Sequence, residues 1–360
     1  MKFYIISGEK SGDLHAANLV KEMMNKNPKL QLRGFGGDRM IEEGVMVVKH
    51  INDLAFMGFT EVVKNIKSIK RNLEFCKKDI DSFQADALIL IDYPGFNFKI
   101  AKYAKEKGIK VFYYISPKVW AWKESRVDLI RKYVDELIVI FPFEVNYFKK
   151  RGITVNYFGN PISDELKKEI APLSLHSNKK IIALLPGSRK QEIERNLPIM
   201  LSVIPDFPKY QFVIAATKNM FQLCTDLSIN TNVKIEKEET YSVLKNSEIA
   251  LVNSGTATLE TALFNTPQLV CYKTDFVTYN LAKLFVKLKW ISLVNIIMDK
   301  EVVKEFIQSD MTKDNLVNEI NYLLSEQGRD KVLLDYKHLR NHLTSENVSD
   351  KVAEFILAKI

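Results

Sequence analysis

IIALLPGSRKQEI, residues Ile181–Ile193, is a short apolar run that stops abruptly and passes into a helical pattern. Five consecutive apolar residues are typical of a strand that is buried on both faces, as strands of parallel sheets are. Pro186 and Gly187 end this strand, and we expect Ser188 to cap a helix that begins with Gln191 close behind. The stretch therefore predicts one strand–turn–helix unit of a parallel α/β sheet.

The turn within this stretch is suited to binding a phosphate group. Backbone N–H groups and the positive end of a helix dipole converge there. Arg189 adds a planar guanidinium group that matches phosphate oxygens. An ordinary turn that carries a surface arginine fits this stretch equally well.

A second turn of the same kind lies further along the chain, in NSGTATLE at Asn253–Glu260. It follows another apolar run and opens another helical pattern, with Ser254, Gly255 and Thr256 at the helix N-terminus. Glu260, one helical turn later, could accept hydrogen bonds from ribose hydroxyls, as acidic residues do in nucleotide-binding folds. Two such turns favour a nucleotide site over coincidence.

Similar apolar runs alternate with helical patterns through the whole chain, which predicts doubly wound parallel sheets. The predicted strands are Phe3–Ile6, Ala85–Ile91, Val111–Ile115, Leu137–Phe141, Thr154–Phe158, Ile181–Leu185, Phe212–Ala216, Val233–Ile235, Ile249–Val252 and Leu269–Cys271. Between the first two strands we expect a helix from near Leu14 and a turn at Gly34–Gly37. From Lys300 to the end we expect only helix.

Composition excludes several classes of protein. With 46% hydrophobic and 27% charged residues the chain is typical of a globular protein, and no apolar run approaches the ~20 residues of a membrane span. The N-terminal apolar run is too short for a signal peptide, so we expect a cytoplasmic protein. Three scattered cysteines indicate neither disulfides nor zinc, and His338 and His342 lack the glutamate of a metalloprotease pair. We therefore expect no metal and no cofactor.

The net charge of +8 is concentrated in the first half of the chain. Residues 1–180 contain 31 Lys and Arg against 22 Asp and Glu, and residues 181–360 contain 21 against 22. A basic half suggests an anionic partner. Because no nucleic-acid motif is present, that partner is expected to be a phosphorylated ligand or an acidic membrane surface.

Asp92 is the candidate catalytic residue. It directly follows the predicted strand Ala85–Ile91, as the sole acid at the strand end where open α/β sheets bind their ligands. A helix-capping role for Asp92 is the alternative. Trp120, in the loop after the next strand, is expected to form a binding wall or to fill the core.

An amphipathic stripe marks a candidate membrane contact. Its apolar residues recur at helical spacing beside several lysines: Phe59, Val62, Val63, Ile66 and Ile69. A basic amphipathic helix of this kind can lie on an anionic membrane surface. A surface helix packed against the core has the same pattern.

Eight short motifs together resemble the lipid-A-disaccharide synthases, bacterial glycosyltransferases of GT-B architecture. In chain order they are SGEKSGD, GGDRM, FMGFTEV, IDYPGFN, YISPKVWAW, FPFE, LLPGSRKQEI and SGTATLE, from Ser7 to Glu260. The resemblance implies two Rossmann-like domains that face each other across a cleft. It also implies transfer of 2,3-diacylglucosamine from UDP-2,3-diacylglucosamine to 2,3-diacylglucosamine 1-phosphate, with inversion, to give a β-1,6-linked disaccharide 1-phosphate and UDP.

The resemblance also assigns roles to residues of this chain. Asp92 matches the proposed catalytic carboxylate, Arg189 the residue that faces the UDP phosphates, and Asn295 a further donor-site residue. The remaining site residues it implies are Gly187, Ser188, Ser254, Gly255, Thr256 and Glu260 on the donor side, and Glu9, Ser11, Gly12, Asn97 and Trp120 on the acceptor side. Two departures are Gly95, where many relatives have a second acid, and Asn160, where many have a histidine.

The expected organisation is an N-terminal acceptor and membrane domain at residues 1–165, and a C-terminal donor domain at 178–345. A terminal helix at 346–360 would pack on the N-terminal domain or on a partner chain, as in a homodimer. The protein would attach peripherally to the inner membrane. Other functions stay open: another GT-B lipid glycosyltransferase, a UDP-sugar epimerase, or a non-catalytic membrane adaptor that responds to UDP.

Overall fold

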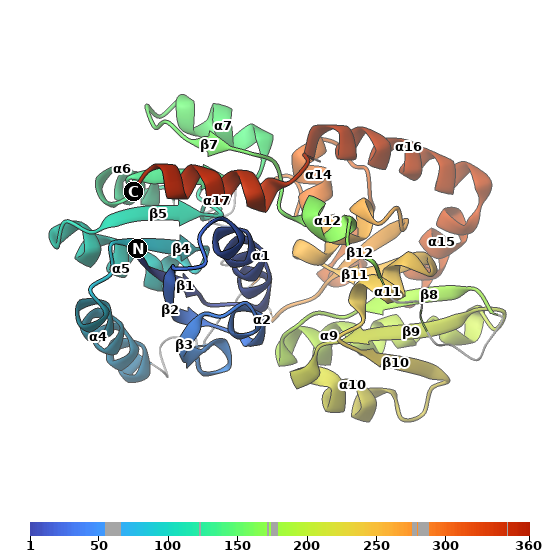
Figure 1. The fold of residues 1–360 in the computed structure, drawn as a ribbon. Coiled ribbons are helices and arrows are strands. Elements are labelled where there is room, and N and C mark those ends of the chain that lie inside the picture. The colour runs from blue at the N-terminus through green and yellow to red at the C-terminus, as the bar shows by residue number, and fades with distance from the viewer. Residues whose placement is uncertain are drawn as a thin grey trace. The chain divides into compact units, whose positions relative to one another are not determined.

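The computed structural model describes residues 1–54, 66–121, 124–170, 173, 179–275, 279, 288–343 and 345–360. They form two compact units, each built on one parallel sheet (Figure 1). One unit comprises Met1–Glu165 with Leu343–Ile360, and the other comprises Leu166–His342. Two parallel sheets with flanking helices confirm the predicted α/β fold class.

The sheet of the N-terminal unit has seven parallel strands in the order β3-β2-β1-β4-β5-β6-β7. The strands are β1 (Lys2–Ser7), β2 (Gln31–Gly36), β3 (Met46–His50), β4 (Ala87–Ile91), β5 (Lys110–Tyr114), β6 (Glu136–Val139) and β7 (Asn156–Tyr157). The chain moves outward from β1 to β3 and then returns to the other side of β1. The strand order therefore reverses between β1 and β4, and open α/β sheets bind ligands beyond the carboxyl ends of such a pair.

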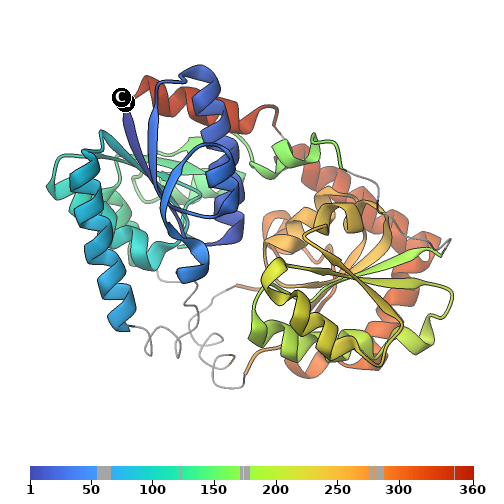
Figure 2. The same ribbon diagram turned by 60° about the horizontal axis from the view of Figure 1, so that its bottom comes forward.

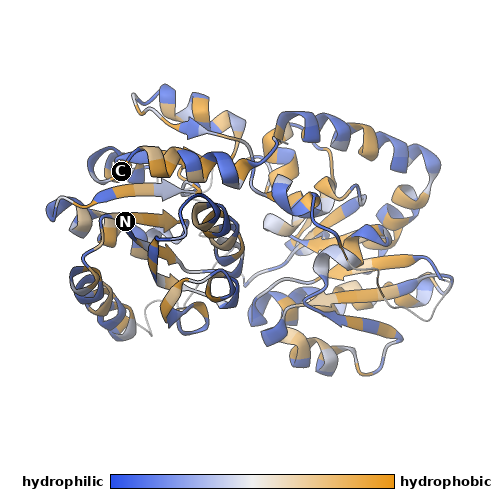
Figure 3. Ribbon diagram, in the orientation of Figure 1, coloured by the Kyte–Doolittle hydropathy of each residue, from blue (hydrophilic) through white to orange (hydrophobic). Residues whose placement is uncertain are grey.

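Helices cover both faces of this sheet (Figure 2). They are α1 (Lys10–Lys26), α2 (Asp38–Glu42), α4 (Ile66–Phe83), α5 (Pro94–Glu106), α6 (Arg126–Tyr133), α7 (Pro142–Lys149), α8 (Ile162–Leu166) and α17 (Val348–Ala358), with a 3-10 turn at Ile51–Asp53. Successive strand residues enter opposite layers. Tyr4 packs with α4 and α5, and Phe3 packs with α1 and α17. Burial on both faces explains the unbroken apolar runs, and Figure 3 shows the strands largely in orange.

The C-terminal helix α17 belongs to the N-terminal unit. It lies beside α1 and buries Val352 and Ile356 in the same core (Figure 1). The carboxylate of Asp164 accepts hydrogen bonds from the first backbone N–H groups of α17, those of Val348 at 3.0 Å and Ser349 at 2.8 Å. A carboxylate at a helix N-terminus stabilises the helix, so these contacts fix where α17 begins.

The sheet of the C-terminal unit has six parallel strands in the order β10-β9-β8-β11-β12-β13. The strands are β8 (Ile181–Leu185), β9 (Gln211–Ala216), β10 (Val233–Lys237), β11 (Ser247–Asn253), β12 (Gln268–Tyr272) and β13 (Glu305–Ile307). Its helices are α9 (Lys190–Leu201), α10 (Phe221–Ser228), α11 (Thr240–Lys245), α12 (Thr256–Leu263), α14 (Leu293–Met298), α15 (Lys313–Leu324) and α16 (Glu326–Leu343), with 3-10 turns at Ile204–Asp206, Lys218–Met220 and Gln308–Asp310. This strand order is again that of a Rossmann fold, and it reverses between β8 and β11.

Three local predictions were wrong. The first helix begins at Lys10 rather than near Leu14. The glycines Gly34 and Gly36 lie inside β2 instead of a turn, and Gly34 is required because a Cβ there would collide with the backbone of Ile5 on β1. The region after Lys300 is not all helix, because it contains the edge strand β13.

Candidate active site

The reversal point of the N-terminal sheet carries two of the predicted residues, Glu9 and Asp92. Glu9 follows β1 as the N-cap of α1, and Asp92 follows β4 just before α5. The two strands pair in parallel up to Ser7 and Ile91, so both turns leave the same edge of the sheet next to each other. The fold therefore brings together two carboxylates that lie 83 positions apart in the sequence.

The backbone at this edge is strained. Asp92 and Tyr93 have φ angles of 43° and 46°, and Ile115 after β5 has 64°. Side chains disfavour this left-handed conformation, a β-branched isoleucine most of all, and such strain concentrates at functional sites. The carbonyl oxygen of Asp92 accepts hydrogen bonds from the Tyr113 hydroxyl at 2.6 Å and from Nδ2 of Asn97 at 2.8 Å. Asn97, which is fully buried, thus supports the backbone of the turn.

The charges around Asp92 are mixed. Burial, followed by the negative charge of Glu9, raises the pKa of Asp92 to about 6, although the positive charges of Lys118 and Arg126 act in the opposite direction. Asp92 is the acid at the end of β4, and Glu9 at the end of β1 adds a second negative charge beside it. Neither cation was predicted from the sequence as part of this site. Lys118 could have been found, because it lies in the loop of the motif YISPKVWAW, but no pattern pointed to Arg126.

Trp120 is held by a buried carboxylate. Its indole Nε1 donates a hydrogen bond to Oε1 of Glu144 at 3.0 Å, and the other carboxylate oxygen accepts from the backbone N–H groups of Phe141 at 3.0 Å and Ile140 at 3.2 Å. Burial raises the pKa of Glu144 to about 7. The Trp120 ring also meets the Phe143 ring edge-on. Glu144 thus holds the indole of Trp120 in place. The positive charge of Lys118 also acts on this carboxylate, in the direction that lowers its pKa.

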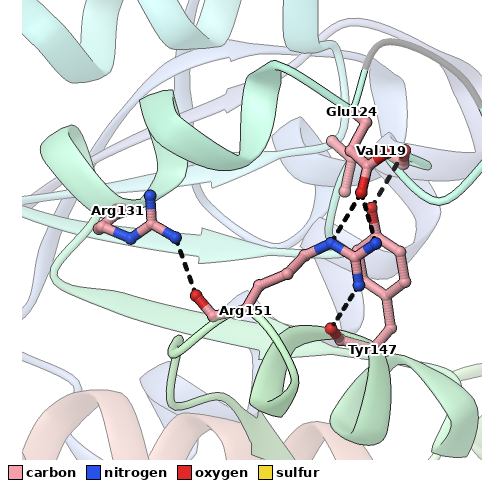
Figure 4. A network of polar contacts seen from close by, with 5 residues as sticks. All are labelled: Val119, Glu124, Arg131, Tyr147 and Arg151. Carbon is pink, nitrogen blue, oxygen red and sulfur yellow. Dashed lines mark hydrogen bonds and ion pairs between the residues drawn. The ribbon is translucent and has the colours of Figure 1, made fainter.

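A second set of contacts fixes the same loop from outside (Figure 4). The guanidinium of Arg151 forms an ion pair with Glu124 and lies 3.6 Å over the ring centroid of Tyr147. The Tyr147 hydroxyl in turn donates to the carbonyl oxygen of Val119 at 3.5 Å. Arg131 donates to the carbonyl oxygen of Arg151 at 2.8 Å and so contacts the segment after α7 rather than the loop itself. The loop that carries Lys118 and Trp120 is therefore attached to α7.

Ser11 and Gly12 were expected in the loop before the first helix, but the structure places both within that helix. Both belong to the first turn of α1, where Gly12 is buried and Ser11 is half-buried. A Cβ on Gly12 would come within 2.6 Å of the Ser7 hydroxyl oxygen. Gly12 therefore allows α1 to pack closely on β1. Within the motif SGEKSGD, it is Glu9 whose negative charge raises the pKa of Asp92.

The reversal point of the C-terminal sheet carries the predicted phosphate turn. Gly187 has a φ of 118°, and Arg189 is the N-cap of α9, which begins at Lys190. No side chain caps this helix, so the prediction that Ser188 does so was wrong. Instead the backbone N–H of Ser188 donates to Oε2 of Glu192 at 3.3 Å, and Arg189 forms an ion pair with the other oxygen at 3.0 Å.

The second predicted turn lies beside the first, because β11 pairs with β8. Gly255 is the N-cap of α12, and a Cβ added to it would meet nothing within 4 Å, so the space above this turn is open. Thr256 is exposed, and the Ser254 hydroxyl donates to the carbonyl oxygen of Ile291 at 3.0 Å. Glu260 is half-buried and accepts a hydrogen bond from the Tyr241 hydroxyl at 3.4 Å.

A buried asparagine that the sequence analysis missed connects the two turns. Asn196 on α9 is fully buried and donates to Oδ1 of Asn253, at the end of β11, at 3.0 Å. Its own Oδ1 accepts from the backbone N–H of Lys273, at the end of β12, at 2.8 Å. The middle of α9 is thereby held at a fixed position relative to both neighbouring strand ends.

Comparison with known proteins decides the family. The model of the lipid-A-disaccharide synthetase family matches residues 3–360. Lipid-A-disaccharide synthase 1 of Legionella pneumophila strain Philadelphia 1 is 36% identical over 99% of this chain and 97% of its own length. The corresponding synthase of Geobacter sulfurreducens is 33% identical over 99% and 96%. The chain belongs to the lipid-A-disaccharide synthetase family.

Solved structures agree on the fold of the family. A putative UDP-N-acetylglucosamine 2-epimerase from Listeria monocytogenes superposes with a TM-score of 0.70, at 12% identity over 98% of this chain and 94% of that one. The glycosyltransferase of kitacinnamycin superposes with a TM-score of 0.64, at 10% identity over 100% and 99%. The two-sheet GT-B architecture is therefore shared with both epimerases and glycosyltransferases.

Asn295, which the resemblance placed at the donor site, makes its contacts inside the unit. Its Nδ2 donates to the carbonyl oxygen of Val303 at 2.8 Å and to Glu305 at 2.9 Å, and its Oδ1 accepts from the N–H groups of Val302 and Val303. Glu305 also accepts from the backbone N–H groups of residues 291 and 292. Asn295 thus organises the loop that Ser254 contacts, and it is fully buried.

The two departures from the family pattern have different structural settings. A Cβ added to Gly95 would meet nothing within 4 Å, so the fold does not require glycine there. Asn160 is fully buried and donates to the carbonyl oxygen of Ile140 at 3.2 Å, while it accepts from the N–H of Ile162 at 3.1 Å. Asn160 therefore has a structural role at the start of α8.

Part of the predicted membrane stripe lies outside the described residues, namely Phe59, Val62 and Val63. Of the other two members, Ile66 is 52% exposed, whereas Ile69 packs against the N-terminal core. Within the described ranges, no helix is long and apolar enough to cross a membrane. The same ranges contain no cluster of three His, Cys, Asp or Glu side chains that could hold a metal ion.

Proposed function

We propose that this chain transfers 2,3-diacylglucosamine from UDP-2,3-diacylglucosamine to the 6-hydroxyl of 2,3-diacylglucosamine 1-phosphate. Membership of the family supports this reaction. The single observation that carries the mechanism is Asp92, a strained and half-buried carboxylate with a pKa of about 6 at a sheet reversal point. A general base is most effective when its pKa lies near the working pH.

In the proposed reaction Asp92 takes the proton of the acceptor hydroxyl while that oxygen forms a bond to the anomeric carbon. The bond between the anomeric carbon and the UDP oxygen breaks, and UDP leaves with its electron pair. One displacement inverts the anomeric carbon and gives a β linkage. Lys118 and Arg126 lie close enough to Asp92 to influence its charge, so they are suited to an anionic acceptor such as a sugar 1-phosphate.

The donor side is proposed to bind UDP at the turns after β8 and β11. Arg189 and the N-termini of α9 and α12 provide positive charge where the leaving diphosphate becomes more negative. An S. aureus MnaA–UDP co-structure has a TM-score of 0.70 to this chain at 15% identity over 100% of it and 97% of that chain, and it supports UDP as the ligand of this architecture. Glu260 would then accept from the ribose.

The test is product analysis with defined substrates. The purified protein is incubated with UDP-2,3-diacylglucosamine, with and without 2,3-diacylglucosamine 1-phosphate, and the products are identified by mass spectrometry. A disaccharide 1-phosphate that forms only with acceptor supports the proposal. An isomerised UDP-sugar without acceptor would instead indicate the epimerase that the solved neighbours suggest, and UDP binding without any product would indicate an adaptor.

The proposal includes reversible attachment to an anionic membrane surface, where both acylated substrates would reside. The exposed Ile66 at the start of α4 and the lysines near it support this contact. A homodimer remains an expectation from the resemblance.

A further inference from the structure

One carboxylate occupies the donors of the proposed phosphate turn. Oε1 of Glu192 pairs with the guanidinium of Arg189 at 3.0 Å, and Oε2 accepts from the backbone N–H of Ser188 at 3.3 Å. Arg189 is 46% exposed, whereas Glu192 is only 19% exposed. The acid is therefore largely covered by the surrounding protein, whereas the arginine reaches outward.

The space above Gly187 confirms where this carboxylate lies. A Cβ built on Gly187 would be 2.6 Å from Oε2 of Glu192 and 2.9 Å from Nδ2 of Asn253. Gly187 also has a φ of 118°, which disfavours any side chain. The carboxylate and Asn253 thus fill the space beside Gly187, next to the donors that a bound anion would use.

We propose that Glu192 is an internal stand-in for the phosphate, which a bound diphosphate must displace from Arg189 and Ser188. A carboxylate and a phosphate accept from the same kinds of donor, but one carboxylate carries less negative charge than a diphosphate. Only a ligand with more charge than the carboxylate gains from the exchange. Glu192 therefore selects ligands by their charge, an inference that rests on the proposed UDP site.

A Glu192 that competes with the phosphates and a Glu192 that only orients Arg189 predict opposite changes in UDP affinity when the side chain is replaced. If Glu192 merely oriented Arg189, its loss would weaken UDP binding. If Glu192 competes with the phosphates, removing its charge strengthens UDP binding. UDP then does not have to break the ion pair with Arg189, and its phosphates are not repelled by a nearby carboxylate. Uridine, which lacks phosphates, would not need the exchange.

The test is the E192Q variant, whose amide keeps the size of the side chain and an oxygen for the Ser188 N–H. Calorimetry should show UDP binding about tenfold tighter than in wild type, equivalent to ~1.4 kcal/mol, with uridine affinity unchanged. The matched control is E194Q, on the same helix, where the acid is exposed and pairs with Lys190 at 3.7 Å. It should leave UDP affinity within about twofold of wild type, because exposed charges are screened by salt.

UDP affinity that is equal or weaker in E192Q, while wild type binds UDP, would overturn this inference and leave the proposed function intact. Wild type that binds neither UDP nor uridine would contradict the proposed function and the inference with it. A crystal structure of wild type with UDP tests the point without any variant. In that structure the Glu192 carboxylate should have left Arg189, and an intact ion pair beside bound UDP would refute the exchange.

Discussion

At the scale of single residues, Asp92 combines features that work against the stability of its charged form. It is half-buried and lies within reach of the negative charge of Glu9. A raised pKa means that the folded state binds the proton more tightly than the unfolded chain does. The resulting loss of stability is absent below pH 4, grows up to about pH 6 and is complete above it. A residue kept under such conditions is suited to proton transfer rather than to packing.

Asp92→Asn is expected to lower kcat by roughly two to four powers of ten, the usual contribution of a general base. In wild type, kcat should fall as the pH drops below about 6, because the base must be deprotonated. The variant should lose this acidic limb and should unfold at no lower temperature than wild type at pH 7. Single-turnover rates of both proteins over a range of pH test the rate and its acidic limb, and thermal unfolding at pH 7 tests the stability. A near-normal rate would remove Asp92 from the mechanism.

Arg189→Ala is expected to weaken UDP binding by about 1.5–3 kcal/mol, the contribution of a hydrogen bond to a charged group. Lysine should rescue it only in part, because an ammonium group lacks the planar fork. Lys190→Ala is the matched control, since this neighbour is an exposed cation that pairs with Glu194. Calorimetry that finds equal UDP affinity in wild type and Arg189→Ala would place the phosphates elsewhere.

At the scale of secondary-structure elements, the loop after β5 is the part of the proposed acceptor side that the most side-chain contacts hold in place. Glu144 at the start of α7 holds Trp120 from within, and Arg151 just after α7 holds Glu124 from outside. Because both supports come from α7 and its end, this helix determines where the loop lies. Its side chains are expected to influence acceptor binding without touching the acceptor.

Arg151→Gln is expected to raise the KM for the acceptor several-fold while UDP affinity stays unchanged. The substitution removes an ion pair and a stacked cation, which together stabilise the loop by about 1–2 kcal/mol. Arg131→Gln is the control, because Arg131 reaches the backbone of Arg151 and not the loop. Steady-state kinetics with the acceptor varied, and calorimetry with UDP, separate the two effects. A changed UDP affinity in Arg151→Gln would show that the loop does not act on the acceptor alone.

At the scale of the whole molecule, the uneven charge of the chain bears on the proposed attachment to an anionic membrane surface. The first half, with its excess of Lys and Arg, contains the exposed Ile66. Each basic residue near an anionic membrane contributes about 1 kcal/mol, and each buried aliphatic side chain contributes about 1.5–3 kcal/mol. A few of both suffice for reversible binding.

Ile66→Glu is therefore expected to reduce co-sedimentation with anionic vesicles severalfold, while UDP affinity and thermal unfolding are unchanged. The control is Ile229→Glu, at an isoleucine that is 79% exposed but lies in the other unit. Salt should release wild type only partly, because it screens the charges and not the apolar contact. Equal vesicle binding by both variants would show that the contact does not involve the start of α4.

Much of this architecture was determined by local sequence. The runs Ala85–Ile91 and Ile181–Leu185 predicted the central strands β4 and β8 correctly, because a strand covered on both faces must be apolar throughout. The edge strands β3 and β13 were missed because that constraint is weaker there, whereas the edge strands β7 and β10 were predicted. Met46–His50 is largely half-exposed, and Glu305–Ile307 has three residues, so neither carries a pattern of its own.

The sequence also indicated Asp92 and Arg189, since each follows a strand whose end could be recognised. What surrounds them was decided only by the tertiary structure. Glu9 and Lys118 come near Asp92 because β1 and β5 are the neighbours of β4, an order that no local pattern records. Asn295 was placed at the donor site by the resemblance, whereas in the structure its side chain bonds to Val302, Val303 and Glu305, contacts that no local pattern recorded. Strand ends can be recognised in the sequence from where apolar runs stop, whereas the partners of a side chain depend on which strands lie side by side.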